Sequence, residues 1–133
     1  MPGNRFVFDT HSLIWSLCAP KRLGRKARMA MKQVEEGLSQ AWIPAAVAFE
    51  VSMLRELGRI NIGLPELQEA VQDTSSIQFL SLDWQQVDTF SSLAQIRDPF
   101  DRMIVSAART QRAKLITKDE NIQDTGLVQT VWG

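Results

Sequence analysis

Four acidic side chains lie where a carboxylate could serve chemistry: Asp9, Glu50, Asp101 and Asp119. Asp9 directly follows residues 5–8, a run rich in Phe and Val that predicts a β-strand. Asp119 comes just after a second apolar run, 115–117. Carboxylates that meet repel one another, so some must keep a proton or share a cation at neutral pH.

Divalent cations such as Mg²⁺ and Mn²⁺ prefer oxygen ligands of this kind. A bound ion stabilises negative charge on phosphate oxygens, while a carboxylate can orient a water molecule for attack on phosphorus. The acids therefore predict hydrolysis of a phosphodiester if the fold brings them together. Glu50 is the most unusual, because it lies in the otherwise apolar helical pattern 45–54, where an unpaired charge is seldom buried.

Each acid also has a purely structural interpretation. Asp9 and Asp98 can cap helices, and Asp101 gains from the dipole at a helix start. Asp119 suits a turn, and Glu50 can face solvent. None of the acids indicates a function by itself, so a catalytic role requires that the fold brings them to one place.

Short apolar runs alternate with helical patterns along the chain. Strands are predicted at 5–8, 41–43, 77–82, 115–117 and 127–131. Helices are predicted from a cap at Thr10 to Pro20, from Pro44 to Gly58, and over 25–36, 65–73, 84–94 and 99–111. This alternation predicts one α/β domain over residues 1–133, with helices on both faces of a parallel sheet.

In such sheets, ligands bind outside the carboxyl ends of the strands, at the point where the strand order reverses. Asp9 and Asp119 each follow a predicted strand, so both are expected at that edge. The expected edge is thus also the expected metal site.

The composition suits one globular domain: 133 residues, 44% hydrophobic and 23% charged, with a formal net charge of zero. The charge is nevertheless uneven, since residues 21–34 carry six Lys or Arg and no acid, whereas 60–96 carry five acids and no Lys or Arg. The basic run predicts contacts with the phosphate groups of a ligand. The residues concerned are Arg25, Lys26, Arg28 and Lys32. A solvated basic helix face is an equally good interpretation.

Cys18 is the single cysteine, which excludes an internal disulfide and a cysteine-based zinc site. The N-terminal residues lack the pattern of a secretory signal, and no run approaches the ~20 apolar residues of a membrane helix. We therefore expect a cytoplasmic protein without a membrane partner.

Several segments, taken in order, resemble the PIN-domain family, and specifically the VapC-like toxins of prokaryotic toxin–antitoxin pairs. They are Phe8-Asp9-Thr10-His11, Leu13-Ile14-Trp15, Glu50 in its apolar helix, Asp98-Pro99-Phe100-Asp101-Arg102-Met103-Ile104, and Leu115-Ile116-Thr117-Lys118-Asp119. The gaps between the acids also fit: 50−9 = 41, 101−50 = 51 and 119−101 = 18. The resemblance spans nearly the whole chain, and its most specific part is the Asp-Pro-Phe-Asp-Arg stretch.

The resemblance implies a three-layer α/β/α PIN-like fold with about five parallel strands, a Mg²⁺ or Mn²⁺ cofactor and single-stranded RNA as substrate. It assigns the acidic centre to Asp9, Glu50, Asp101 and Asp119. Thr10, Thr117 and Asp98 are secondary polar candidates. Many relatives carry His shortly before the Asp-Pro pair, where this chain has Gln95-Ile96-Arg97; we expect that difference to alter the RNA or partner surface. His11 is a minor candidate for a general base.

A small antitoxin protein and a second copy of the chain are the protein partners that the resemblance implies. Apolar side chains on the first two predicted helices could form a groove for a partner helix. They are Leu13, Ile14, Trp15, Met29, Met31 and Val34. The alternative is that all of them belong to the core.

Three rival functions were weighed against the nuclease. A phosphoaspartyl phosphatase needs Asp-x-Asp after the first strand, but this chain has Asp9-Thr10-His11. A receiver-type phosphoacceptor needs an early acidic pair, which is missing. A catalytically inert PIN-like module that binds protein or RNA stays open, because a complete set of acids does not prove turnover.

Overall fold

A computed structural model describes residues 3–133, and its centre is a five-stranded parallel sheet. The strands are β1 (Arg5–Phe8), β2 (Gln40–Pro44), β3 (Ile77–Leu80), β4 (Lys114–Ile116) and β5 (Thr130–Val131). The helices are α1 (Thr10–Cys18), α2 (Arg25–Glu35), α3 (Ala45–Glu56), α4 (Leu64–Asp73), α5 (Trp84–Ser91), α6 (Pro99–Thr110) and α7 (Glu120–Thr125), with a 3₁₀ turn at Pro20–Arg22.

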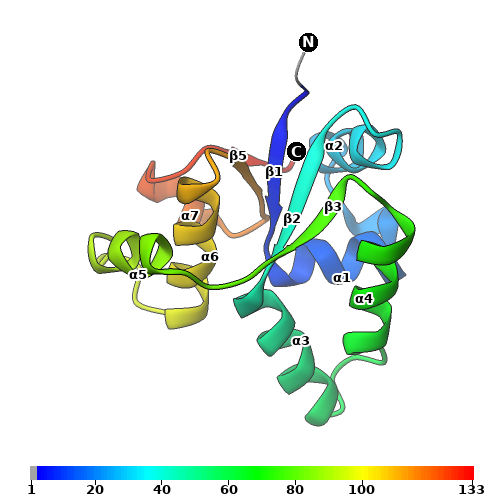
Figure 1. Cartoon of the computed structure of the whole chain (residues 1–133), viewed down its shortest axis with the longest axis horizontal. Coiled ribbons are helices and arrows are strands. Elements are labelled where there is room, and N and C mark those ends of the chain that lie inside the picture. Colours follow the sequence, from blue (N-terminus) through cyan, green and yellow to red (C-terminus); the bar gives the residue numbers. More distant parts are fainter. Residues whose placement is uncertain (1–2) are drawn as a thin grey trace.

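The strand order is β3-β2-β1-β4-β5, so the chain moves outward from β1 to β3 and then crosses back to β4. Figure 1 shows α1, α2 and α4 on one side of the sheet and α5, α6 and α7 on the other. This arrangement follows from right-handed crossovers that run in opposite directions. The predicted α/β/α layering is confirmed, and the strand order reverses between β1 and β4.

The central strands are apolar on both faces because helices cover both faces. In β1, Phe6, Val7 and Phe8 are all buried, and in β4 so are Leu115 and Ile116. These side chains join one core with residues from α1, α2, α3 and α6. Burial on both faces makes the sheet a rigid frame for the loops at its ends.

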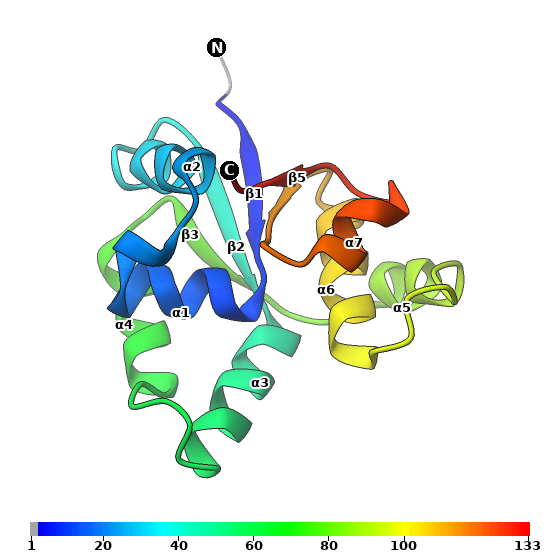
Figure 2. The same cartoon turned by 180° about the vertical axis from the view of Figure 1, so that it is seen from behind.

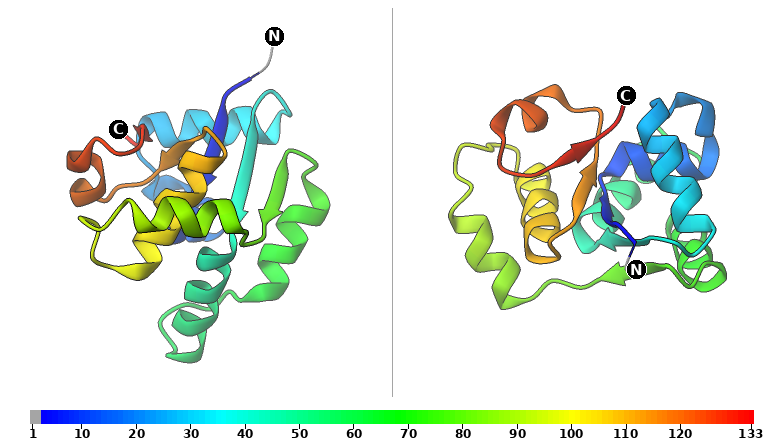
Figure 3. Two further views of the ribbon diagram at one scale, coloured as in Figure 1. Left: turned by 60° about the vertical axis from the view of Figure 1, so that its left-hand side comes forward. Right: turned by 90° about the horizontal axis from the view of Figure 1, so that it is seen from above.

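Figure 2 shows the molecule from behind, with α1 beginning where β1 ends and α3 beginning where β2 ends. Figure 3 shows α3 projecting beyond this end of the sheet with α4 beside it. None of the helices within residues 3–133 is both long and apolar enough to cross a membrane.

Several predicted boundaries were wrong by a few residues. The third strand ends at Leu80 rather than 82, the fifth strand covers only Thr130–Val131, and α5 ends at Ser91. Helix α7 was not predicted at all. It has six residues and a single buried side chain, Ile122, which is too short a pattern to show helical periodicity.

The groove predicted on the first two helices was wrong. Four of the six side chains that were to line it are buried: Leu13, Ile14, Met31 and Val34. Trp15 packs against the core, and only Met29 is mainly exposed, at 53%. The large exposed apolar side chains lie mostly elsewhere, and Phe49, Met53 and Leu57 on or just after α3 are among them.

Candidate active site

Two of the four predicted acids lie on either side of the point where the strand order reverses. Asp9 follows β1 and Asp119 comes three residues after the end of β4, the strand that pairs with β1. The backbone N–H of Asp9 donates to the carbonyl of Ile116, 3.3 Å away, which joins the two strand ends. The rule for parallel sheets places a ligand site at this crevice.

Asp9 is both a helix cap and a buried carboxyl group. One of its carboxylate oxygens accepts a hydrogen bond from the backbone N–H of Ser12 at 2.9 Å, so Asp9, and not Thr10 as predicted, caps α1. Burial raises the pKa of Asp9, although hydrogen bonds from Thr117 and Ser12 oppose the rise. The structural role predicted as an alternative is therefore real, but it does not account for a carboxyl group held out of water.

Glu50 reaches the same place from α3. The hydroxyl of Thr10, at the start of α1, donates to Glu50 Oε1 at 2.5 Å. Thr10 is buried and Glu50 is half-buried, so this contact between residues 40 apart in sequence turns the carboxylate inward. The alternative in which Glu50 simply faces solvent is wrong.

Asp98 caps α6 as predicted, because its carboxylate accepts the backbone N–H of Asp101 at 3.0 Å. Pro99 takes the first helical position, where its missing N–H costs nothing. This local geometry sets Asp101 in the first turn of α6. Asp98 itself is exposed, which suits a cap.

The pKa of Asp101 indicates that the acids lie near one another. The pKa of Asp101 is raised to about 7, first by burial and then by the negative charge around it. The acids that contribute are, in order, Asp98, Asp119, Glu50 and Asp9. All four predicted acids therefore share one electrostatic environment, although they come from four separate segments of the chain.

Thr117 connects the ends of β1 and β4. Its side chain is completely buried, its hydroxyl oxygen accepts the backbone N–H of Asp119 at 3.0 Å, and it also hydrogen-bonds Asp9. Asp119 in turn caps α7 by accepting the N–H groups of Asn121 and Ile122. The two predicted threonines thus each hold an acid of the site in place.

The donor set suits a hard divalent cation, because it consists of carboxylate and hydroxyl oxygens and contains no thiol. Burial first, and then four nearby carboxylates, raise the pKa of Asp101, and a bound cation would favour the ionised form of such a group. Among residues 3–133, no three His, Cys, Asp or Glu side chains stand close enough together to surround one ion as they are.

Comparison with known proteins now identifies the fold. The sequence profile of the PIN domain matches residues 6–127 of this chain. The chain belongs to the PIN-domain family. The match includes all four acids of the site.

A curated relative of this PIN domain is ribonuclease VapC22 of Mycobacterium tuberculosis. It is 26% identical over 119 residues, which cover 88% of each protein. Two solved structures are similar in fold. A VapBC2 complex from Rickettsia felis bound to promoter DNA aligns with a TM-score of 0.70 and 11% identity, covering 97% of this chain and 99% of that one. A DNA-bound VapBC from Salmonella typhimurium aligns with a TM-score of 0.66 and 15% identity, covering 96% of both chains.

The basic residues predicted to contact RNA are not brought to the acids. Arg25, Lys26, Arg28 and Lys32 are all exposed on α2, and Lys32 lies 4.0 Å from Glu36. Figure 2 shows α2 beside the amino ends of β1 and β2, whereas the acids lie at the carboxyl ends. A single RNA strand that contacts both the basic residues of α2 and the acids would have to cross the surface near α1.

Sequence reasoning missed two further cations, Arg22 and Lys118. Both lie close to the ring of Trp15 on α1. Lys118 is the direct neighbour of Asp119 in a segment that carries the family resemblance, and this adjacency was a usable signal. His11 is exposed, and its ring lies against that of Trp15.

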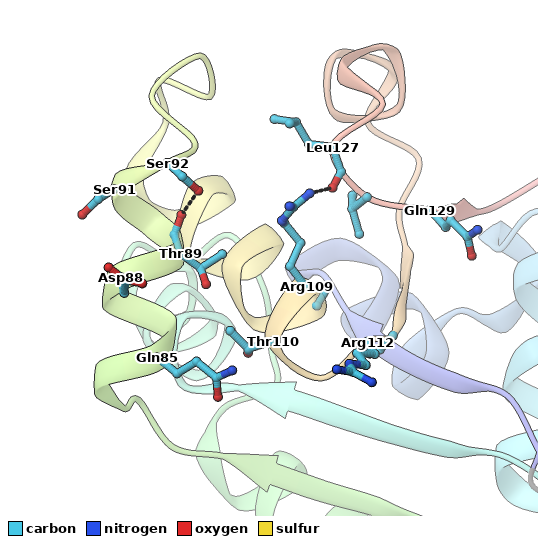
Figure 4. Close-up of a pocket in the computed structure, with 13 residues that line it drawn as sticks. Gln85, Asp88, Thr89, Ser91, Ser92, Arg109, Thr110, Arg112, Leu127 and Gln129 are labelled. Carbon is cyan, nitrogen blue, oxygen red and sulfur yellow. Dashed lines mark hydrogen bonds between the residues drawn. The ribbon is translucent and has the colours of Figure 1, made fainter.

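A second concave region of the PIN domain, which we call the polar hollow, lies between α5, the end of α6 and residues 127–129. Figure 4 shows Arg109 and Arg112 on one side of it and Asp88 and Thr89 on the other. The Arg109 guanidinium donates to the carbonyl of Leu127, which ties α6 to the segment before β5. None of the predicted acids lines the polar hollow.

Proposed function

We propose that the protein is a Mg²⁺- or Mn²⁺-dependent endoribonuclease that hydrolyses phosphodiester bonds in single-stranded RNA, as the toxin of a toxin–antitoxin pair. The observation that carries the proposal is the gathering of acids from separate segments. The hydroxyl of Thr10, next to Asp9, holds Glu50, and the charges of Asp119, Glu50 and Asp9 add to burial and to the neighbouring Asp98 in raising the pKa of Asp101. A relative named as a ribonuclease, alignable over 88% of both chains, supports the same activity.

Asp9, Glu50, Asp101 and Asp119 would hold the ion, which would supply Lewis-acid stabilisation of the phosphate oxygens. Thr10 and Thr117 orient two of these carboxylates through hydroxyl hydrogen bonds. Such outer contacts fix the ligand atoms before the ion arrives. The burial of Thr10 and Thr117 keeps bulk water away from these hydrogen bonds.

In the proposed hydrolysis, the oxygen of a water molecule forms a bond to phosphorus and one phosphorus–oxygen ester bond breaks. An ionised carboxylate at the site accepts a proton from the water, and the leaving oxygen gains a proton. Without an ion the pKa of Asp101 is about 7, and a bound cation would favour its ionised form as a ligand.

The test is cleavage of a mixed RNA pool with added Mn²⁺, with Asp9→Asn as the variant. Asp88→Asn, in the polar hollow, is the matched control because it removes the same charge away from the acids. We expect wild type and Asp88→Asn to cut RNA and Asp9→Asn to be inactive. An inert PIN-like binding module would bind RNA or protein without metal-dependent cleavage in any of the three, and that result would reject the nuclease.

For the antitoxin, we propose that an amphipathic helix docks in an apolar groove between α3, α4 and β3. The groove is lined chiefly by Ala48, Phe49, Leu64, Leu67, Val71 and Phe79. Phe49 is 60% exposed and Phe79 is 52% exposed, so large apolar surfaces face solvent at this site. The groove replaces the one predicted on α1 and α2, and the toxin–antitoxin complexes among the structural neighbours support a partner of this kind.

The partner is tested by pull-down from the native host, followed by nuclease assays with and without the co-purified protein. Phe49→Glu should prevent recovery of a small protein that inhibits cleavage. Met29→Glu is the matched control, because Met29 is exposed to a similar degree but lies on α2, outside the groove. Equal loss of the partner in both variants would reject this groove.

We also propose a homodimer that covers the exposed surface of α5, where Trp84 is 87% exposed and Val87 is 51% exposed. Light scattering should show a dimer for wild type and a monomer for Trp84→Ser, whereas an unchanged mass would reject this interface. We place the activity in the cytoplasm, where the proposed substrate is found.

A further inference from the structure

One aromatic side chain next to the acids gathers several polar and cationic neighbours. Around Trp15 lie His11, Arg22, Lys118 and Trp132, and we call these five residues the Trp15 cluster. They come from α1, the 3₁₀ turn after it, the loop after β4, and the residue after β5. Three separate parts of the chain therefore build this surface.

The contacts within the cluster are close. The Arg22 guanidinium carbon lies 4.4 Å from the centroid of the Trp15 ring, and Lys118 Nζ lies 5.8 Å from it. The rings of His11 and Trp132 each lie 5.7 Å from the Trp15 ring in tilted geometry. A cation over an indole face is attracted by the ring quadrupole, so Trp15 restricts where both cations can lie.

The frame under the cluster is rigid. The carbonyl of Trp132 accepts the backbone N–H of Ala27 at 2.9 Å, and this bond joins β5 to α2. At Gly24 an added Cβ would lie only 2.4 Å from the same carbonyl oxygen, so a larger residue would push Trp132 away. Trp132 and hence Trp15 are held by backbone contacts on this side.

The cluster borders the acidic site at two points. His11 comes two residues after Asp9 in the first turn of α1, and its ring lies 5.7 Å from that of Trp15. Lys118 directly precedes Asp119 in the chain. Lys118 therefore adjoins the acidic site through the chain, and Arg22 is linked to it through their shared contact with Trp15.

Arg22 and Lys118 are not neutralised by the acids beside them. Within residues 3–133 the one ion pair is Lys32 with Glu36, and both Arg22 and Lys118 are exposed. Two ordered cations without acidic partners, next to an acidic centre, are suited to an anion that spans both regions. A nucleic-acid strand meets this requirement, because its phosphates repeat along its length.

We propose that Arg22 and Lys118, held by Trp15, form a clamp for a backbone phosphate of the RNA strand next to the phosphate that is cleaved. The inference rests on the proposed function and deepens it by naming the residues that position the substrate. Trp15 is a positioning residue, because it acts through the two cations. Arg22 and Lys118 bind substrate directly.

The experiment measures binding of a short single-stranded 2′-O-methyl RNA, with cleavage of the unmodified RNA measured separately. Arg22→Ala and Lys118→Ala should each weaken binding by about fivefold at low salt and reduce the salt slope by about 0.7. Arg59→Ala is the charge-matched control, since Arg59 is exposed after α3, outside the cluster. It should bind like wild type.

Trp15→Phe distinguishes positioning from simple folding. It keeps an aromatic ring in the core contact but weakens the attraction for both cations. We expect KM for cleavage to rise and kcat to change little, with an unchanged melting temperature. Oligonucleotide binding should also shift the indole N–H resonance of Trp15 but not that of Trp84.

The outcomes separate the clamp from the nuclease. Binding that depends on Arg22 and Lys118 without any cleavage would support the clamp and reject the nuclease. Cleavage with wild-type affinity and salt slope in both alanine variants would support the nuclease and overturn the clamp. Absence of oligonucleotide binding in wild type would overturn it as well. If the variants weaken only a protein complex, the surface is a protein interface and the clamp is rejected.

Discussion

The acidic edge and the polar hollow are both lined by helix ends and loops, yet they differ in how their polar groups are satisfied. In the polar hollow the side chains bond to backbone carbonyls: Arg109 across elements to Leu127, and Thr110 within α6 to Ala107 at 3.1 Å. At the acidic edge, a side chain bonds to a side chain on another element, as Thr10 does to Glu50. The hollow carries charges of both signs, Asp88 and Arg112 among them, whereas at the edge burial and the surrounding acids together raise the pKa of Asp101.

The physical reason lies in the direction of the chain. The carboxyl ends of parallel strands lead into helix N-termini, whose free N–H groups favour acids such as Asp9 and Asp119. The polar hollow receives the C-terminus of α6, where Arg109 and Arg112 are the favoured residues. Uncompensated charge, more than concavity, marks the candidate active site.

The largest expected difference between the two regions comes from neutralising one acid in each. Asp101→Asn should reduce RNA cleavage by more than about 100-fold. Loss of a residue that binds the ion directly should reduce activity more than the 10- to 100-fold that is typical when a residue positioning such a ligand is lost. Asp88→Asn in the hollow should leave cleavage unchanged. The measurement is single-turnover cleavage with saturating Mn²⁺. A fully active Asp101→Asn protein would rule out the proposed mechanism.

Removing one hydroxyl group from each region should give the next largest difference in activity. Thr10→Val removes the hydrogen bond to Glu50 while keeping the shape of the side chain, so we expect a loss of about 10- to 100-fold in activity. Thr10→Ser keeps the hydroxyl and should recover most of it. Thr110→Val, which removes a hydroxyl from the hollow, is the control and should behave like wild type in the same assay.

A smaller effect is expected from the basic face of α2. If Arg25 and Arg28 contact RNA, changing both to Ala should reduce the salt slope of binding by about 0.7 per lost contact. Arg112→Ala in the hollow should not change the slope. An unchanged slope in the double variant would leave α2 as a solvated basic face, and the cluster around Trp15 would then be the main RNA contact.

Changing the helix cap Asp98 should have a still smaller effect on activity. Asp98→Asn should reduce activity by only about threefold or less, because Asn caps a helix nearly as well as Asp. Removing this charge should also lower the pKa of Asp101 toward its usual value, since Asp98 is one cause of the rise. Carbon-13 titration of the Asp101 carboxyl in the two proteins tests this, and an unmoved midpoint would contradict the electrostatic picture.

The effect of pH on stability should be modest but diagnostic. Folded Asp101 keeps its proton until the pH approaches its raised pKa of about 7, whereas in the unfolded chain it ionises near the ordinary pKa of 3.8. The folded state therefore binds more protons between these values, and its melting temperature should fall as the pH rises from about 4 to 7. Asp101→Asn or added Mn²⁺ should flatten this fall, but Asp88→Asn should not. A melting temperature that rises over this range in wild type would contradict the raised pKa.

The local sequence was enough to predict the elements and most of the caps. Apolar runs indicated all five strands, and Asp98 was correctly predicted as a cap from the types of residue around it. These features depend on contacts within a few residues, which a sequence displays directly. The prediction failed for α7, where six mostly polar residues form a helix that tertiary contacts support.

The site could be proposed from the order and spacing of the acids, but its properties come from contacts between distant residues. Glu50 looked anomalous in an apolar helix, and only the fold supplied Thr10 as its partner from 40 residues away. The same holds for Arg22 and Lys118, which no local pattern joins but which Trp15 brings together.

The amino-acid sequence by itself determined the alternation of strands and helices, the parallel sheet, and the presence of an acid after β1 and after β4. Only the tertiary structure decided which apolar surfaces stay exposed. Leu13 and Val34 lie in the core, whereas Phe49 and Phe79 face solvent. The reason is that periodicity shows that a helix has an apolar face but not whether the sheet covers that face. The tertiary structure also decided the protonation of Asp101, because charges of residues far apart in the chain add only once the fold has brought them together.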